Sequence, residues 1–291
     1  GTTAASIVGY GQWSDVVCVS EIGKPLYNFY GYVVEGVYES LEDIENSPKT
    51  AKHPANGVYN RSNTVWIGDL KYKDVNEDGV INDQDRTDIG SPLPKFTYGW
   101  NNTFRYKGFD LNIFINGSYG NKVLNYSLMN GPSGGLASMR SAWVNQNASA
   151  IADRAQLAPI DPDKVYETGS WYDDITNVKV VNSGTKTPRP TLNDPNDNDR
   201  LSTRYIEDGS YLRIKNLSLG YTFPKKWMQK IKFDNIRVYC NIQNLYTFTK
   251  YSGYDPEVGA STQDATGYSY GVDNGRYPSP TTYSFGVSLS F

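Results

Sequence analysis

The sequence lacks the long apolar segments that a membrane-spanning helix requires. Its longest uninterrupted apolar run is residues 16–19, whereas a helix needs about 20 predominantly apolar residues to cross a bilayer. This excludes a transmembrane helix in the chain but not a membrane β-barrel. Barrel strands alternate apolar and polar residues and therefore never produce a long apolar run.

Cysteine, histidine and surplus positive charge are also scarce. Cys18 and Cys240 lie far apart in strand-like stretches, so we predict two free apolar side chains and no disulfide. The single His53 has no Cys or His close to it in the sequence and is expected at the surface. With 28 Lys and Arg against 31 Asp and Glu, no basic surplus neutralises phosphates, and we expect no nucleic-acid partner.

Tyrosine, by contrast, is abundant, with 24 Tyr against 10 Phe and 6 Trp. The chain is also rich in Asn and Gly and poor in Leu. This composition is typical of half-hydrated surfaces in extracellular β-proteins and outer-membrane barrels.

Several segments alternate with a period of two residues, as β-strands with two unlike faces do. One face is apolar and aromatic, and the other carries Ser, Thr, Asn, Gln and Gly with an occasional Arg. A soluble sandwich usually carries Lys and Glu on its polar face, so small uncharged residues favour a water-filled lumen with lipid on the opposite side. The expected strands are residues 96–106, 109–116, 211–223, 236–243 and 282–291.

The connections between these segments alternate between short and long. Short turns at residues 107–108 and 224–235 alternate with long connections at roughly 120–203 and 250–280, as periplasmic turns and external loops do in membrane barrels. Residues 9–20 are a candidate sixth strand. Because about eight strands are the minimum for a closed barrel, the remaining strands are expected on another chain or on a preceding segment.

Residues 74–85 match the twelve-residue calcium loop, in which oxygen ligands recur at alternate positions and a glycine makes the sharp turn. Gly79 occupies the turn position, and Ile81 is expected to anchor the loop to the core. The predicted ligands are Asp74, Asn76, Asp78, the carbonyl of Val80, Asn82 and Asp85. Oxygen ligands alone favour a hard cation, Ca²⁺ before Mg²⁺.

The flanks of this loop lack amphipathic helices, so we expect a structural clip and not a sensor EF-hand. The alternative is a solvated turn rich in Asp and Asn. A second acidic stretch, residues 193–199, lacks the glycine and the spacing and is predicted to be a polar turn.

Longer motifs resemble a known family. They read GDLKYKD at 68–74, IGSPLPKFTYG at 89–99, RYIEDGSYLRIKNLSLGY at 204–221, NIQNL at 241–245 and GYDPE at 253–257. From about residue 25 onward, the chain resembles the C-terminal barrel part of SusC/RagA-type TonB-linked outer-membrane transporters.

The resemblance implies that residues 1–291 belong to a roughly 22-stranded antiparallel transmembrane β-barrel in the bacterial outer membrane. The N-terminal plug and the first strands are then absent from this chain, as is the segment that contacts TonB. The resemblance further implies TonB-dependent import of glycans or peptides and a SusD-like surface lipoprotein as a lid. Phe291 fits the terminal aromatic residue of outer-membrane insertion signals.

A second hypothesis is a calcium-stapled extracellular β-domain that binds carbohydrate or acts as an adhesin. A version of this domain that acts on glycans as an enzyme is disfavoured, and no enzymatic activity is predicted. The sequence contains no G-x-S-x-G or H-E-x-x-H motif, and adjacent carboxylates such as Asp173 and Asp174 point to opposite faces of a strand.

Aromatic residues in the long connections are candidate substrate contacts, because such rings stack on sugars or pack against peptides. Packing within the loops is the competing role. These candidates are Trp143, Trp171, Tyr172, Tyr251 and Tyr254. Arg105 and Arg237 are expected on the lumen side, paired with carboxylates of the wall.

Overall fold

The computed structural model describes residues 3–6, 16–130, 152–191, 193–228, 233–259, 270–273 and 275–291. The chain divides into two compact units, each assembled from separated stretches. The first unit comprises Gly1–Ser91, Leu124–Glu207 and Gly259–Gly275, and the second comprises Pro92–Val123, Asp208–Val258 and Arg276–Phe291. The described residues of the first long connection from Leu124 onward therefore belong to the same unit as the first 91 residues, whereas the second long connection is divided between the two units.

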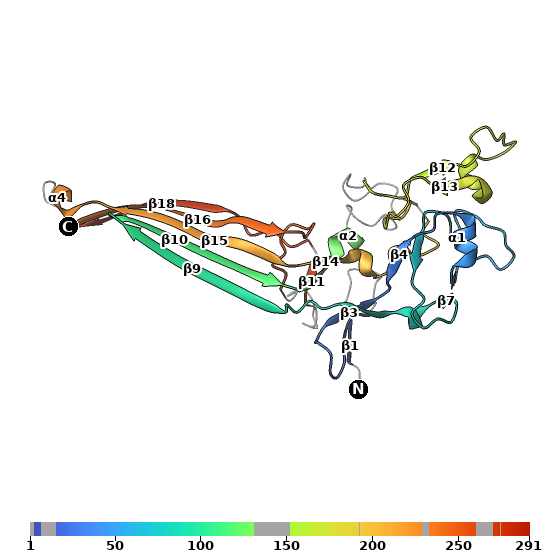
Figure 1. Cartoon of the computed structure of the whole chain (residues 1–291), viewed down its shortest axis with the longest axis horizontal. Helices are drawn as coiled ribbons and strands as arrows, with labels where there is room; N and C mark the ends of the chain where they lie inside the picture. The colour runs from blue at the N-terminus through green and yellow to red at the C-terminus, as the bar shows by residue number, and fades with distance from the viewer. Residues whose placement is uncertain are drawn as a thin grey trace. The chain divides into compact units, whose positions relative to one another are not determined.

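The second unit is a five-stranded antiparallel sheet in the order β18-β16-β15-β10-β9 (Figure 1). Its strands are β9 (Phe96–Tyr106), β10 (Phe109–Tyr119), β15 (Tyr211–Thr222), β16 (Asn235–Thr249) and β18 (Thr282–Ser290). The short helix α4 (Lys225–Met228) lies between β15 and β16, at the end of the sheet where the chain terminates (Figure 1). All five strands expected from the alternation are confirmed.

A tight turn and a bulge determine how these strands pair. Lys107 and Gly108, with φ of 45° and 91°, form the β9–β10 turn, and positive φ at both positions matches the twist of a two-residue hairpin. The pairing of β15 with β16 shifts register between Ile214 and Asn216, which forms a bulge opposite Asn244, a residue with φ of 51°. This bulge interrupts the alternation, which explains why β16 extends beyond its predicted end at Gln243.

The first unit contains a four-stranded sheet in the order β1-β2-β3-β8. Its strands are β1 (Thr3–Ser6), β2 (Val16–Ser20), β3 (Asn28–Gly31) and β8 (Thr87–Gly90). The described part of the candidate sixth strand forms β2, which pairs with β1 and β3 and not with the five-stranded sheet. Consecutive residues Val17, Cys18 and Val19 are all buried, which suits a strand enclosed on both faces.

Short elements complete the fold. The remaining paired strands are β4 (Val34–Val37) with β6 (Leu70–Tyr72), β5 (Lys49–Thr50) with β7 (Val80–Ile81), β12 (Leu157–Pro159) with β13 (Val178–Val180), and β11 (Lys122–Asn125) between β14 (Ile206–Asp208) and β17 (Val272–Asp273). The helices are α1 (Leu41–Asn46), α2 (Tyr126–Asn130), and the 3₁₀ turns η1 (Asp83–Asp85), η2 (Trp171–Asp173), η3 (Ile175–Asn177) and η4 (Thr203–Tyr205). Neither Cys18 nor Cys240 forms a disulfide, as predicted.

Three apolar clusters form the core of the first unit, and each joins distant parts of the chain. Phe29 packs with Leu124 and Leu201 in the first cluster. Leu70 and Ile81 belong to the second, and the third surrounds Trp66. Residues that are far apart in sequence therefore depend on one another for burial.

A buried polar network fixes residues 193–199 in the same unit. Asp69 is fully buried, lies 2.9 Å from the Arg189 Nε and accepts a hydrogen bond from Asn198 Nδ2 at 3.3 Å. The Asn198 Nδ2 also donates to Asp194 Oδ1 at 2.7 Å. The predicted polar turn is present, but Asn196 and Asn198 are each only 1% exposed, so it is not a solvated turn.

Asp194 makes the stability of the first unit depend on pH. Burial, followed by the neighbouring charges of Asp69 and Asp199, raises its pKa from 3.8 to about 8. Folding therefore takes up a proton between these values, and stability falls as pH rises from about 4 to 8. Hydrogen exchange between pH 5 and 8 should show this loss in the native chain and a flatter profile in Asp194→Asn. Asp163→Asn, at an exposed position, should keep the native profile; an unchanged profile in Asp194→Asn would contradict this assignment.

A substitution at Gly31 tests the close packing of β3 against Leu201. A Cβ at Gly31 would lie 2.5 Å from the carbonyl oxygen of Leu201, so Gly31→Ala should destabilise the first unit by about 1–3 kcal/mol through overpacking. Gly36→Ala is the matched control, because its Cβ would lie 3.9 Å from its nearest neighbour. Hydrogen exchange of β3 and β8 amides measures both; equal protection in the two variants would refute the close contact.

Candidate functional site

The five-stranded sheet carries one continuous apolar face. Register partners across all five strands form a row of apolar side chains: Phe104, Leu111, Leu219, Cys240 and Phe285. The face is exposed, with Phe285 at 79% and Trp100 at 53%. Contiguous apolar surface of this kind is rare on soluble monomers and marks contact with a membrane or a partner.

Aromatic rings gather at both ends of this face. At the end with the β9–β10 turn, ring centroids of Phe109 and Tyr221 lie 4.5 Å apart, and those of Tyr221 and Phe223 5.1 Å apart. At the other end, Phe96 stacks on Tyr119 at 5.3 Å. Aromatic bands that flank an apolar zone are typical of strands that cross a bilayer, because the rings prefer the interface with water.

The opposite face carries an uncharged polar row along the same five strands. Its members are also register partners: Thr103, Asn112, Ser218, Asn241 and Ser284. Asn112 Nδ2 donates to Asn101 Oδ1 at 2.8 Å and to Thr103 Oγ1 at 2.9 Å. This face therefore offers amides and hydroxyls to water or to a polar ligand.

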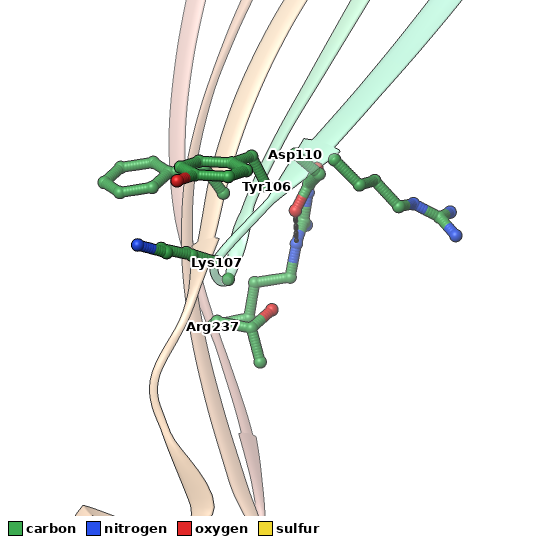
Figure 2. A pocket seen from close by; sticks show the side chains of 8 residues that line it. Tyr106, Lys107, Asp110 and Arg237 are labelled. Carbon is green, nitrogen blue, oxygen red and sulfur yellow. Dashed lines mark hydrogen bonds and ion pairs between the residues drawn. The ribbon is translucent and has the colours of Figure 1, made fainter.

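An ion pair crosses the middle strand on the polar face. Arg237 on β16 contacts Asp110 on β10, with Nη2–Oδ2 at 2.6 Å and Nε–Oδ1 at 3.1 Å. Gly220 on β15 lies beneath it, and a Cβ there would collide with the guanidinium. Figure 2 shows this pair beside the hairpin turn, with Tyr106 and Lys107 on the other side of the ribbons. The expectation that Arg237 pairs with a wall carboxylate is confirmed; for Arg105 the described residues show no ion pair.

A buried arginine ties the segment after β16 to the same face. Arg213 on β15 is 2% exposed and contacts Asp255 at 2.5 Å and Glu257 at 2.7 Å. Its Nε also donates to Thr247 Oγ1 at 2.8 Å. The sequence motifs at 204–221 and 253–257 therefore meet through this residue, which sequence spacing alone did not reveal.

The calcium-like loop has the glycine turn and the buried Ile81 that the motif predicted. Gly79 makes the turn with φ of 81°, its N–H donates to Asp74 Oδ2 at 2.7 Å, and Ile81 is buried in the core. Asp85 Oδ2 accepts from the Asn82 N–H at 2.7 Å. Within the described residues, no group of three or more Asp, Glu, His or Cys side chains is arranged to hold a metal, so the ligand set stays a prediction.

The predicted substrate contacts are distributed over both units. In the first unit, Trp171 packs against the third apolar cluster. The Arg61 guanidinium lies over the Tyr172 ring, with its Cζ 4.4 Å from the ring centroid. In the second unit, Tyr251 is buried and Tyr254 is 76% exposed. Trp143 lies outside the described residues. These five roles stay predictions, and Tyr254 presents the most accessible ring of the four described.

Among the described helices, none has the length and apolarity needed to cross a bilayer.

The chain is similar in sequence to known TonB-dependent receptors and in fold to a solved transporter. No protein-family profile matches the chain. It is 32% identical over 274 residues to TonB-dependent receptor P3 of Formosa agariphila, covering 92% of the chain and 22% of that receptor. It is 26% identical over 223 residues to TonB-dependent receptor SusC of Bacteroides thetaiotaomicron, covering 76% of the chain and 17% of the receptor.

The fold matches a solved structure of the RagAB peptide transporter with a TM-score of 0.56 and 20% identity, covering 94% of this chain and 24% of that one. The chain thus spans about a fifth of the length of the curated relatives it matches. These relatives are named as receptors and transporters, which confirms the prediction that the chain is not an enzyme. Over nine-tenths of its length, the chain is homologous to a part of TonB-dependent receptors, and over about three-quarters of its length to a part of SusC, as its sequence motifs predicted.

Proposed function

We propose that this chain forms part of a β-barrel wall in the bacterial outer membrane and serves TonB-dependent import of glycans or peptides. The two-faced five-stranded sheet carries the proposal. Its exposed apolar row contacts lipid, and its polar row lines a hydrated passage. The alternative, a calcium-stapled soluble domain, would leave the apolar row in water, which opposes the hydrophobic effect.

The remaining parts of the proposal follow from the chemistry of the polar face and from the relatives. Hydroxyl and amide groups suit substrates that are themselves rich in hydrogen-bonding groups, and glycans and peptides both qualify. The solved relative is described as a peptide transporter. A SusD-like lipoprotein is the proposed surface partner, and coupling to TonB would use a part of the protein outside this chain.

We also propose that residues 74–85 bind Ca²⁺ as a structural clip. The loop supplies only oxygen ligands, its glycine turn is formed, and Ile81 anchors it. The Asp74 carboxylate already spans the loop to Gly79, and its oxygens retain further lone pairs for a cation.

The import proposal is tested first on the native polypeptide. Detergent extraction of outer membranes should yield a protein several times larger than 32.5 kDa, together with a lipoprotein, and its deletion should abolish uptake of one glycan or peptide. A lone 32.5 kDa species that is soluble without detergent would contradict the proposal.

A pair of neighbouring substitutions tests which face meets lipid. Leu217→Arg places a charge on the apolar face and should cost about 2–4 kcal/mol near the bilayer centre, so the assembled fraction of the full-length protein should fall. Ser218→Arg, on the polar face of the same strand, should assemble normally. Heat-modifiability on gels measures both, and a reversed order of defects would refute the assignment of faces.

The calcium proposal predicts that added Ca²⁺ stabilises the full-length protein. At a free concentration about 100 times Kd, the gain is about 2.7 kcal/mol, seen as a higher Tm that a chelator reverses. Asp74→Ala combined with Asp78→Ala should abolish this gain, whereas Asp163→Ala, outside the loop, should retain it. If the Tm of the native protein changes neither with added calcium nor with a chelator, calcium binding is disproved.

A further inference from the structure

Three lysines stand at the turn end of the five-stranded sheet, beside its aromatic band. Lys107 occupies the β9–β10 turn, and Lys225 and Lys226 open α4. A hydrogen bond from the Thr222 N–H to the Gly108 carbonyl, at 2.8 Å, joins the hairpin turn to the strand that leads into α4. We name Lys107, Lys225 and Lys226, with Tyr106 and Trp227, the basic turn surface.

The aromatic members place this surface at the boundary of the apolar face. Trp227 is 57% exposed and its ring lies 6.4 Å from that of Phe223, which continues the row through Tyr221. Lys107 Nζ lies 5.2 Å from the centroid of the exposed Tyr106 ring. Figure 2 shows Lys107 and Tyr106 on the same side of the sheet, away from the Asp110–Arg237 pair. The ammonium groups thus adjoin the band of rings that prefers the membrane interface.

The charges at this end are poorly balanced by protein carboxylates. All three lysines are exposed, and among the described residues none of them forms an ion pair with Asp or Glu. Asp110 is engaged by Arg237, which leaves exposed Asp234 as the nearby carboxylate in the β15–β16 connection.

The opposite end of the sheet differs in this respect. There, Lys215 pairs with Glu257 at 3.2 Å, and Lys122 and Lys250 lie close to Asp208. Among the described residues, Lys107, Lys225 and Lys226 have no pair like that of Lys215 with Glu257, so their charges are open to an external anion.

We propose that the basic turn surface binds the phosphate groups of anionic phospholipids in the leaflet next to the hairpin turn. Rings in the interface hold the sheet at a depth where exposed lysines reach the headgroups, and a negatively charged leaflet attracts such lysines. This inference rests on the proposed membrane location and adds a lipid preference to it.

The test uses the full-length transporter in detergent micelles doped with equal amounts of dioleoylphosphatidylglycerol and dioleoylphosphatidylcholine. Native mass spectrometry should show that the native protein retains more of the anionic dioleoylphosphatidylglycerol than of the zwitterionic dioleoylphosphatidylcholine. The variant Lys107→Gln/Lys225→Gln/Lys226→Gln should lose that preference by about tenfold or more. The matched control Lys95→Gln/Lys122→Gln/Lys250→Gln changes the net charge by the same amount at the other end of the sheet. It should keep the lipid preference of the native protein.

Equal retention of both lipids by the native protein would overturn the lipid preference while leaving the membrane location intact. Equal losses in the two triple variants would also overturn it, because the effect would then follow net charge and not this surface. A native protein that stays monodisperse without detergent would instead defeat the membrane location itself.

Discussion

The strict alternation of apolar and polar side chains, kept in register over five strands, is the constraint on which the rest of the second unit depends. Because neighbouring side chains on a strand point to opposite faces, a slip of one residue would exchange the two faces. The partners Phe104, Leu219 and Phe285 can form one row only if every intervening strand keeps its register. The bulge opposite Asn244 is tolerated because Ile214 and Tyr246 resume the same face beyond it.

Glycines on the sheet allow large side chains to lie flat over a neighbouring strand. Gly220 lies under the Arg237 guanidinium, and Gly286 lies under the Tyr239 ring. In each case a Cβ would occupy the space that the larger side chain takes. The polar face can therefore pair Arg237 with Asp110 across two strands, while its central row of Thr103, Asn112, Ser218, Asn241 and Ser284 is uncharged.

The features that were predictable from the sequence are those fixed by short-range patterns. Period-two alternation located all five wall strands, and the Lys107–Gly108 turn and the Gly79 turn follow from local backbone preferences. The assembly of the first unit was not predictable, because its apolar clusters join residues such as Phe29 and Leu201, whose separation leaves no local signal. For the same reason, the sequence of residues 193–199 predicted a polar turn but did not predict that Asp69 and Arg189 complete a buried network around it.

The central claim, that lipid covers one face of the sheet, is tested most directly by scanning β18 with single-cysteine variants of the full-length protein in a background without Cys18 and Cys240. Each cysteine carries a fluorophore, and vesicles with brominated acyl chains quench those in contact with lipid. The account predicts strong quenching at the odd-numbered positions, as at Phe285 and Val287, and weak quenching at the even-numbered ones, as at Ser284. Uniform quenching, or none at either set, would contradict it.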